Sequence, residues 1–156
     1  RRREFAPWTE SVERLRLAEA WLDREALARF AQRVQHHRAQ LLGTMDYARL
    51  SGSLIDMIGA STKSSTLLQH CGIDRSRIRC AVERTPEKWG KVTSGTRIPM
   101  VSEADWRVDP APLSLVVIWQ FRDSILKREA AYLNQGGAFL FPLPHVELVS
   151  QKAMAV

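Results

Sequence analysis

A short apolar segment that runs directly into a glycine turn and then a helix most constrains how this chain can fold. Residues 54–58 read Leu-Ile-Asp-Met-Ile, and residues 59–63 read Gly-Ala-Ser-Thr-Lys. A helical pattern then runs from Ser64 to Cys71. In nucleotide-binding α/β domains, this order of buried strand, tight turn and helix presents backbone N–H groups to a phosphate. The segment therefore predicts an α/β fold with a candidate anion site after its first strand.

The glycine turn has a functional and a structural interpretation. Gly59 can adopt backbone angles that other residues resist, and it lets a ligand approach closely. Ser61 and Thr62 can cap the helix, and Lys63 adds a positive charge. A plain strand-to-helix turn explains these residues equally well, because one glycine is not the three-glycine dinucleotide fingerprint. With both interpretations open, the candidate substrate-binding residues are Gly59, Ala60, Ser61, Thr62, Lys63 and Ser64.

A second group of candidates follows the next predicted strand, residues 78–82. Glu83 lies 24 positions after Gly59, where an acidic side chain in a dinucleotide-type fold can accept hydrogen bonds from a ribose. It can equally be a surface residue paired with Arg84 or Lys88. The polar loop at residues 85–91 would lie near the carboxyl ends of the strands, where such sheets bind ligands. We therefore add Glu83, Arg84 and Lys88 to the candidate substrate-binding residues.

The rest of the chain predicts a parallel sheet with helices on both faces. Residues 1–50 form an N-terminal helical segment whose long amphipathic helix packs on the domain, residues 51–149 form the α/β domain, and residues 150–156 form a tail. Further strands are expected at residues 95–101, 113–118 and 138–141, whereas residues 145–156 carry no strong signal. Between these strands, helical patterns supply the crossover connections that parallel strands require.

The composition argues against several classes of protein. The net charge of +6 admits a polyanionic partner, but basic residues are mixed with acidic ones along the chain, which argues against a nucleic acid. An anionic small molecule such as a nucleotide fits the charge equally well. We expect no membrane partner, because no apolar run is long enough to cross a bilayer and no signal peptide follows the first three arginines. The isolated Cys71 and Cys80 suggest reduced core residues and a cytoplasmic location. Adjacent His36 and His37 point about 100° apart on a helix, so we predict no metal site.

The order of these residues is similar to that of the C-terminal domain of S-adenosylmethionine-dependent C-methyltransferases, which act on nucleotide-linked deoxysugars. The likeness reaches from about residue 25 to residue 149. It is carried by residues 59–63, 66–68, 71–74, 83–84, 90–91, 95–96, 98–99, 136–137 and 142–144, together with Pro86, Lys88, Trp119 and Phe121. Ordered blocks across the chain are more specific than any one motif among them.

The resemblance implies a Rossmann-like domain that contributes nucleotide-sugar binding and interdomain docking rather than methyl transfer. In the family, a nucleotide-diphosphate sugar lies between this domain and a central methyltransferase domain, which holds S-adenosylmethionine. We therefore expect no catalytic residue, no metal and no bound cofactor in this chain. The methyltransferase domain would lie upstream or act in trans. Trp119 and Phe121 would wall the sugar site, unless they are simply core or interface residues.

Three departures from the family pattern bear on the ligand site. Met57 and Ser64 stand where members often have glycine, and Ile118 stands where a proline often precedes the aromatic pair. We expect the fold to survive these changes, while the site is weakened or specialised for another substrate. A purely structural or assembly domain therefore remains an alternative. A dinucleotide-dependent oxidoreductase is disfavoured by the missing glycines, and the formation of a homo-oligomer stays open.

Overall fold

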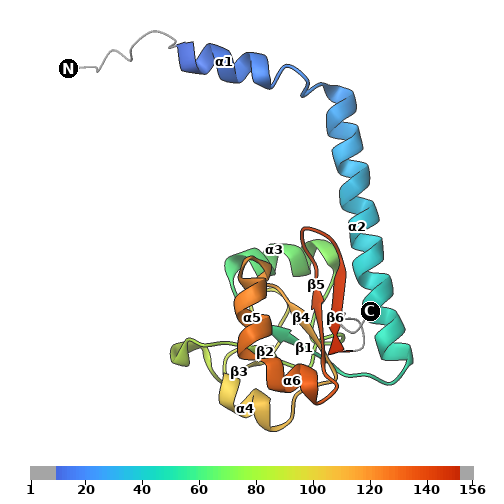
Figure 1. Cartoon of the computed structure of the whole chain (residues 1–156), viewed down its shortest axis with the longest axis vertical. Helices are drawn as coiled ribbons and strands as arrows, with labels where there is room; N and C mark the ends of the chain where they lie inside the picture. Colours follow the sequence, from blue (N-terminus) through green and yellow to red (C-terminus); the bar gives the residue numbers. More distant parts are fainter. Residues whose placement is uncertain (1–9, 152–156) are drawn as a thin grey trace, which may run out of the picture. The chain divides into compact units, whose positions relative to one another are not determined.

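The computed structural model describes residues 10–151, and the chain divides into two compact units between His36 and His37. The first unit contains α1 (Glu10–Ala18) and the beginning of α2 (Arg24–Leu50). The second unit contains the end of α2 and a mixed α/β sheet with its helices. Figure 1 labels these elements in chain order. The boundary between the units therefore falls inside one helix.

The described part of the first unit is helical, and most of its large apolar side chains are exposed. Acidic residues in the first turn of α1 and Arg16 in its last turn complement the helix dipole, but α1 buries no residue. Asp23 marks the start of α2, because its carboxylate accepts the Ala26 N–H at 2.7 Å. Among the helices of residues 10–151, none is both long and apolar enough to cross a bilayer. The exposed large apolar residues of this unit are Val12, Leu15, Leu17, Trp21, Leu22, Leu27 and Phe30.

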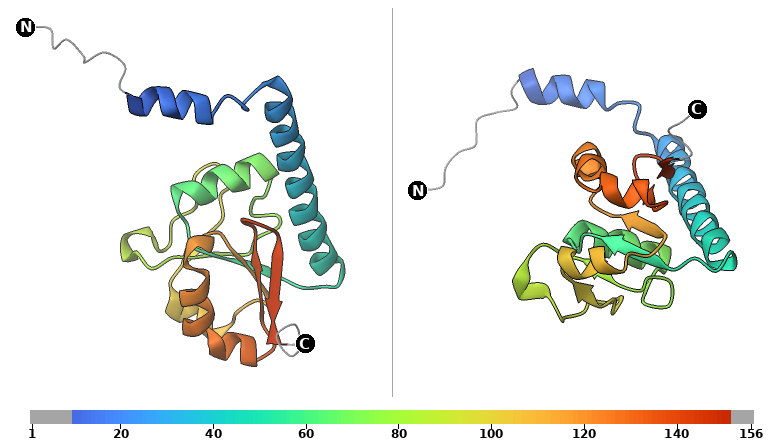
Figure 2. Two further views of the ribbon diagram at one scale, coloured as in Figure 1. Left: turned by 45° about the horizontal axis from the view of Figure 1, so that its top comes forward. Right: turned by 60° about the horizontal axis from the view of Figure 1, so that its bottom comes forward.

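The second unit is built on a six-stranded sheet with the order β3-β2-β1-β4-β5-β6. The first five strands run parallel, and the last pairs antiparallel with β5. This order is the one found in doubly wound dinucleotide-binding domains. The strands can be followed in Figure 2. Their bounds are β1 (Ile55–Ile58), β2 (Ala81–Val82), β3 (Met100–Val101), β4 (Leu113–Val116), β5 (Ala138–Phe141) and β6 (Glu147–Ser150).

Helices cover both faces of this sheet. On one face, Leu41 and Met45 of α2 pack with Leu68 of α3 against alternate strand residues such as Leu115. The other face packs against the later helices and contains Val116. The predicted Rossmann-like α/β class is confirmed. The remaining helical elements are α3 (Thr62–Cys71), η1 (Pro86–Lys88), α4 (Glu103–Val108), η2 (Trp119–Phe121), α5 (Arg122–Arg128) and α6 (Ala130–Asn134).

The sheet differs from the sequence prediction at both of its edges. The predicted strand at residues 95–101 is reduced to the two residues of β3, because Gly95 and Arg97 have φ angles of 76° and 55°. At the other edge, β6 forms where the sequence carried no strong signal. Only Val149 of β6 is buried, and Leu148 is exposed, so its hydrophobic pattern is too weak to indicate a strand.

A buried carboxylate, that of Asp56 in β1, connects the first strand to three other parts of the domain. The Arg79 guanidinium donates to both of its oxygens, at 2.9 and 2.8 Å. The indole N–H of Trp106 and the backbone N–H of Ala111 donate to Oδ2 at 3.1 and 2.8 Å. The Cys80 thiol donates to Oδ1, and its burial, followed by the nearby Asp56 charge, raises the pKa of Cys80 to about 12. These contacts give Asp56 a structural role.

Candidate functional site

The carboxyl ends of β1 and β2 form the wall of a cavity of about 190 Å³. Parallel strands end at the same edge of a sheet, so the segments that follow them in sequence come together there. The lining residues are Ile58, Gly59, Ala60, Ser61, Val82, Glu83, Arg84, Lys88, Glu103 and Ile118. The cavity thus brings together six of the predicted substrate-binding residues, namely Gly59, Ala60, Ser61, Glu83, Arg84 and Lys88.

Glu83 supplies a carboxylate that is held in place from three directions. Its Oε1 accepts the backbone N–H groups of Arg84 and Thr85, at 2.9 and 3.1 Å. Its Oε2 accepts a hydrogen bond from Lys88 Nζ at 3.0 Å. Partial burial raises the pKa of Glu83, but the bonds from Lys88 and Thr85 outweigh that effect and hold its pKa below the ordinary value. Glu83 is therefore a charged, oriented hydrogen-bond acceptor.

Lys88 and Arg84 are the two basic residues that line the cavity, and they differ in their contacts and exposure. Besides its bond to Glu83, Lys88 Nζ donates to the Ala60 carbonyl oxygen at 3.2 Å, so it joins the ends of β1 and β2. The Arg84 side chain is 74% exposed, and its Nε lies 3.9 Å from the carboxylate of Glu103. Arg84 is consequently the cation more open to an incoming anion.

Glu103 belongs to a network of ion pairs that stiffens one side of the cavity. Its carboxylate lies 3.4 Å from Arg107 and 2.9 Å from Arg128. The same two arginines also bind buried Glu129, at 2.6 and 2.7 Å. Burial raises the pKa of Glu129, but the bonds from Arg107 and then Arg128 outweigh it, so the net shift is downward. The network ties α4 to the junction of α5 and α6.

The other predicted residues of the glycine turn lie outside the cavity lining. Thr62 and Lys63 are exposed on the first turn of α3. Ser64 is buried, and its hydroxyl donates to the Ser61 carbonyl, while its own N–H donates to the Ser61 side chain at 3.4 Å. The side chain of Met57 is fully buried in the core. These two departures from the family pattern therefore leave the cavity unobstructed.

Trp119 and Phe121 follow β4 in η2 and do not line the cavity. Trp119 is half-buried and packs against the apolar cluster on the α4–α6 face. Phe121 is 56% exposed. Within the described residues, the structure therefore separates this aromatic pair from the cluster around Glu83.

The sequence analysis did not place Glu103, Ile58 or Val82 in the site, and it named Ile118 only as a departure from the family pattern. Glu103 follows the third strand, so the rule that ligands bind at the carboxyl ends of strands could have indicated it. The position of Ile118 depends on a contact with Gly59 that no local pattern encodes.

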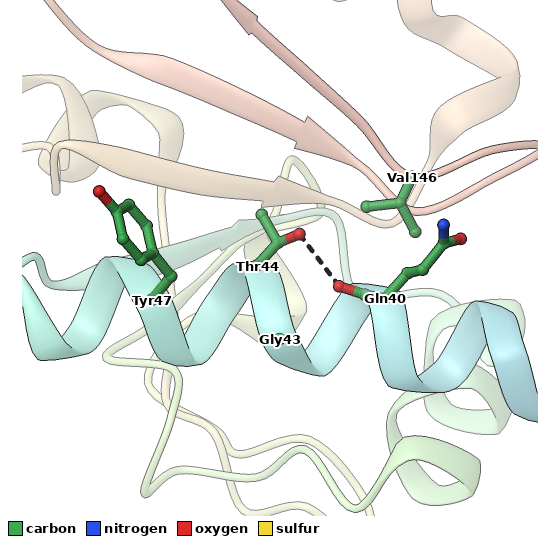
Figure 3. Close-up of a pocket in the computed structure, with 5 residues that line it drawn as sticks. All are labelled: Gln40, Gly43, Thr44, Tyr47 and Val146. Carbon is green, nitrogen blue, oxygen red and sulfur yellow. Dashed lines mark hydrogen bonds between the residues drawn. The ribbon is translucent and has the colours of Figure 1, made fainter.

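Two other cavities offer less chemistry, because none of their lining residues is charged. A groove of about 500 Å³ lies along α2. Figure 3 shows its lining residues, among which the Thr44 hydroxyl donates to the Gln40 carbonyl at 3.0 Å. Its other lining residues are Gly43, Tyr47 and Val146. A cavity of about 250 Å³ lies beside the amino ends of β4 and β5, next to the Tyr132 hydroxyl, which already donates to the Ala111 carbonyl at 2.8 Å. The cavity around Glu83 is therefore the candidate site.

The histidines and cysteines of the described residues form no candidate metal site. In the part of the chain that the structure describes, no three His, Cys, Asp or Glu side chains are grouped so that they could hold a metal ion. His37 Nε2 contacts the Pro142 carbonyl oxygen. Cys71 and Cys80 are free and buried.

Comparison with known proteins identifies the family. A profile of the C-methyltransferase C-terminal domain matches residues 2–144. The chain belongs to that family. It is 31% identical over 124 residues to the C-methyltransferase NovU of Streptomyces niveus, an alignment that covers 80% of this chain and 30% of that relative. This C-methyltransferase C-terminal domain thus spans about 30% of the length of the relative that it matches.

Proposed function

We propose that this domain contributes nucleotide-sugar binding and interdomain docking to a C-methyltransferase and does not itself transfer the methyl group. The observation that carries the binding role is the Glu83 carboxylate, which directly follows β2 in a cavity shared with the turn after β1. An acidic side chain at this place in a doubly wound sheet accepts hydrogen bonds from ribose hydroxyls. This carboxylate supports a nucleotide as the ligand, and the family resemblance extends the proposal to a nucleotide-diphosphate sugar.

Each part of that ligand has a candidate partner. The first turn of α3 offers backbone N–H groups and the Lys63 ammonium to a diphosphate. Glu83 accepts hydrogen bonds from hydroxyl groups of the ligand. The exposed guanidinium of Arg84 donates a charge-assisted hydrogen bond to the diphosphate. Trp119 and Phe121 would then contact the sugar only where the methyltransferase domain joins this one.

The size of the cavity indicates how much of the ligand it holds. Its volume of about 190 Å³ falls below the range of pockets that enclose a whole drug-sized ligand, about 300–1,000 Å³. It therefore accommodates a sugar ring of the nucleotide, and the rest of the ligand lies outside it. The partner domain would cover that outer part.

The docking role rests on the first unit. Its exposed apolar side chains include Leu15, Trp21, Leu27 and Phe30, and exposed apolar surface is typical of sites that contact another protein. The family profile extends over this segment. We propose that it packs against a methyltransferase domain, upstream or in trans, which would bind S-adenosylmethionine. The free, buried cysteines fit a cytoplasmic setting for this assembly.

A purely structural domain is the second candidate function. It is favoured by the internal pairing of Lys88 with Glu83 and of Glu103 with its arginines, because paired charges need no ligand. In that case the domain would brace its partner without binding a nucleotide.

Calorimetric titration of the whole chain separates these functions. The ligands are a thymidine diphosphate sugar, thymidine diphosphate, NADH and S-adenosylmethionine. Binding of only the first two supports the binding module. Binding of none supports the structural domain, and tight binding of NADH would contradict a nucleotide-sugar site.

A further inference from the structure

The strand order of the sheet reverses between β1 and β4, and this reversal defines a possible ligand crevice. In doubly wound sheets, dinucleotides bind across the crevice at the reversal, outside the carboxyl ends of these two strands. Here Gly59 follows β1, and Ile118 follows β4 by two residues. The Val117 N–H donates to the Ile58 carbonyl at 3.2 Å, so the two strands stay paired beyond their last common register. Access to the crevice therefore depends on the side chains directly above them.

The side chain of Ile118 occupies the space above Gly59. Gly59 has a φ of +95°, and a Cβ at this position would lie 2.7 Å from Ile118 Cγ2 and 3.2 Å from Cγ1. In the dinucleotide fingerprint, a glycine lacks a side chain so that the backbone can approach the pyrophosphate. In this chain, the same freed space is filled by the isoleucine.

Ile118 also forms a wall of the cavity around Glu83. The other lining residues come from the ends of β1 and β2 and from Lys88 and Glu103, so the open volume lies on one side of the reversal. Ile118 packs against the apolar cluster on the α4–α6 face, and its β-branched side chain has few alternative rotamers. The Ile118 side chain therefore forms a rigid wall of the cavity.

We infer that Ile118 is a specificity-determining residue that limits the ligand to one nucleoside diphosphate unit and excludes dinucleotides. The inference rests on the proposed function, since it assumes that the cavity around Glu83 accepts a nucleotide sugar ring. A nucleoside diphosphate reaches the cavity from α3 without crossing the reversal. A dinucleotide has to place its second nucleoside beyond Ile118, toward β4, where the isoleucine blocks its pyrophosphate.

The test compares the binding of thymidine diphosphate and of NADH to the whole chain and to Ile118→Ala. Calorimetry on the wild-type chain should show thymidine diphosphate binding at least about tenfold tighter than NADH. Ile118→Ala removes Cγ1, Cγ2 and Cδ1, and it should raise the affinity for NADH about tenfold while changing that for thymidine diphosphate much less. Leu126→Ala is the matched control, because Leu126 packs on the same apolar cluster but lies outside the cavity lining. It should leave the preference between the two ligands unchanged.

The outcomes distinguish this inference from the proposed function. If thymidine diphosphate binds but NADH binds equally well to the wild-type chain, the inference is overturned and the proposed function stands. The same holds if Ile118→Ala folds, binds thymidine diphosphate and shows no gain for NADH. If thymidine diphosphate binds neither protein, the proposed function fails and this inference fails with it. Ile118→Val, which keeps Cγ1 and Cγ2, replaces the alanine variant if the latter does not fold, and its smaller gain for NADH is read in the same way.

Discussion

The Asp56 side chain is buried in the first strand, and its hydrogen bonds to surrounding donors stabilise the domain. If Asp56 is replaced by alanine, the Arg79 guanidinium loses its buried partner, and the Trp106 and Ala111 N–H groups lose their acceptor. Removing one member of a buried ion pair and leaving buried donors unpaired costs about 3 kcal/mol or more. We expect Asp56→Ala to lower the free energy of unfolding by that amount in urea denaturation.

The matched control is Asp109→Ala. Asp109 also binds Arg79, at 2.8 Å, but its side chain is 84% exposed. An exposed ion pair contributes about 0–1 kcal/mol, so this variant should stay close to the wild-type stability. An equal loss of unfolding free energy in the two variants would show that the burial of Asp56 does not increase its contribution to stability.

The second prediction at the scale of a single residue concerns the role of Lys63 in ligand binding. It is exposed on the first turn of α3, outside the cavity lining, where it can meet a diphosphate only beyond the cavity. Under the proposed function, Lys63→Ala should weaken the binding of a thymidine diphosphate sugar by about 1.5–3 kcal/mol. Calorimetry measures this change, with Lys127→Ala, at an exposed position of α5, as the control. An unchanged affinity would remove Lys63 from the binding site.

Among the elements, α4 is joined to the junction of α5 and α6 by ion pairs. The Glu129 carboxylate in these ion pairs makes the stability of the domain depend on pH. Hydrogen bonds from Arg107 and Arg128 outweigh the burial of Glu129 and hold its pKa below the ordinary value of 4.5. The unfolded carboxyl titrates near 4.5 and the folded one lower, so the unfolded chain binds the proton first. The stabilisation from Glu129 is therefore complete above about pH 4.5 and is lost as the pH falls through the folded-state pKa.

We expect Glu129→Gln to remove part of this acid sensitivity. Urea denaturation at several pH values should show a shallower decline in stability below pH 4.5 than in the wild-type chain. At neutral pH the variant should lose about 1–2 kcal/mol, because its arginine partners are partly solvated. Glu87→Gln, in the exposed loop that follows β2, should keep the wild-type slope. An identical pH profile for all three proteins would exclude Glu129 as a source of the acid sensitivity.

At the scale of the whole molecule, the proposed function implies a division of labour between this chain and a methyltransferase domain. We predict that the purified 156-residue chain transfers no methyl group from S-adenosylmethionine to a thymidine diphosphate sugar. Under the proposed function, the methyl-donor site and the acid and base groups would belong to another domain. A radiolabel transfer assay measures this, with a buffer blank as the reference. Turnover above the blank that depends on the chain's concentration would contradict the division.

The docking surface gives a second expectation at this scale. Leu27→Gln and Phe30→Gln together should weaken association with a separately produced methyltransferase domain of this family, because they replace apolar contacts of exposed side chains. The thermal midpoint of the chain should change little, since both residues are exposed. Undiminished association in sedimentation experiments would place the docking surface elsewhere.

The sequence by itself determined the elements whose causes are local. The glycine turn after β1 and the start and end of α3 follow from side-chain caps and backbone angles: Ser61 caps the helix as expected, and Gly72 ends it in the left-handed conformation. The alternation of strand and helix required crossover connections, so it also determined a parallel sheet. The neighbourhood of Glu83 and the glycine turn followed from that topology.

Only the tertiary structure decided the features that depend on contacts between distant segments. The antiparallel β6 exists because β5 offers it a partner, although only one of its own side chains is buried. Asp56 appeared in sequence as a polar interruption of an apolar strand, and its role came from donors up to 55 positions away. Ile118, which follows the neighbouring strand β4, likewise contacts Gly59 although it is distant in sequence. Local patterns record the conformation of a segment, but the packing of one side chain on another is set only when the strands are in register.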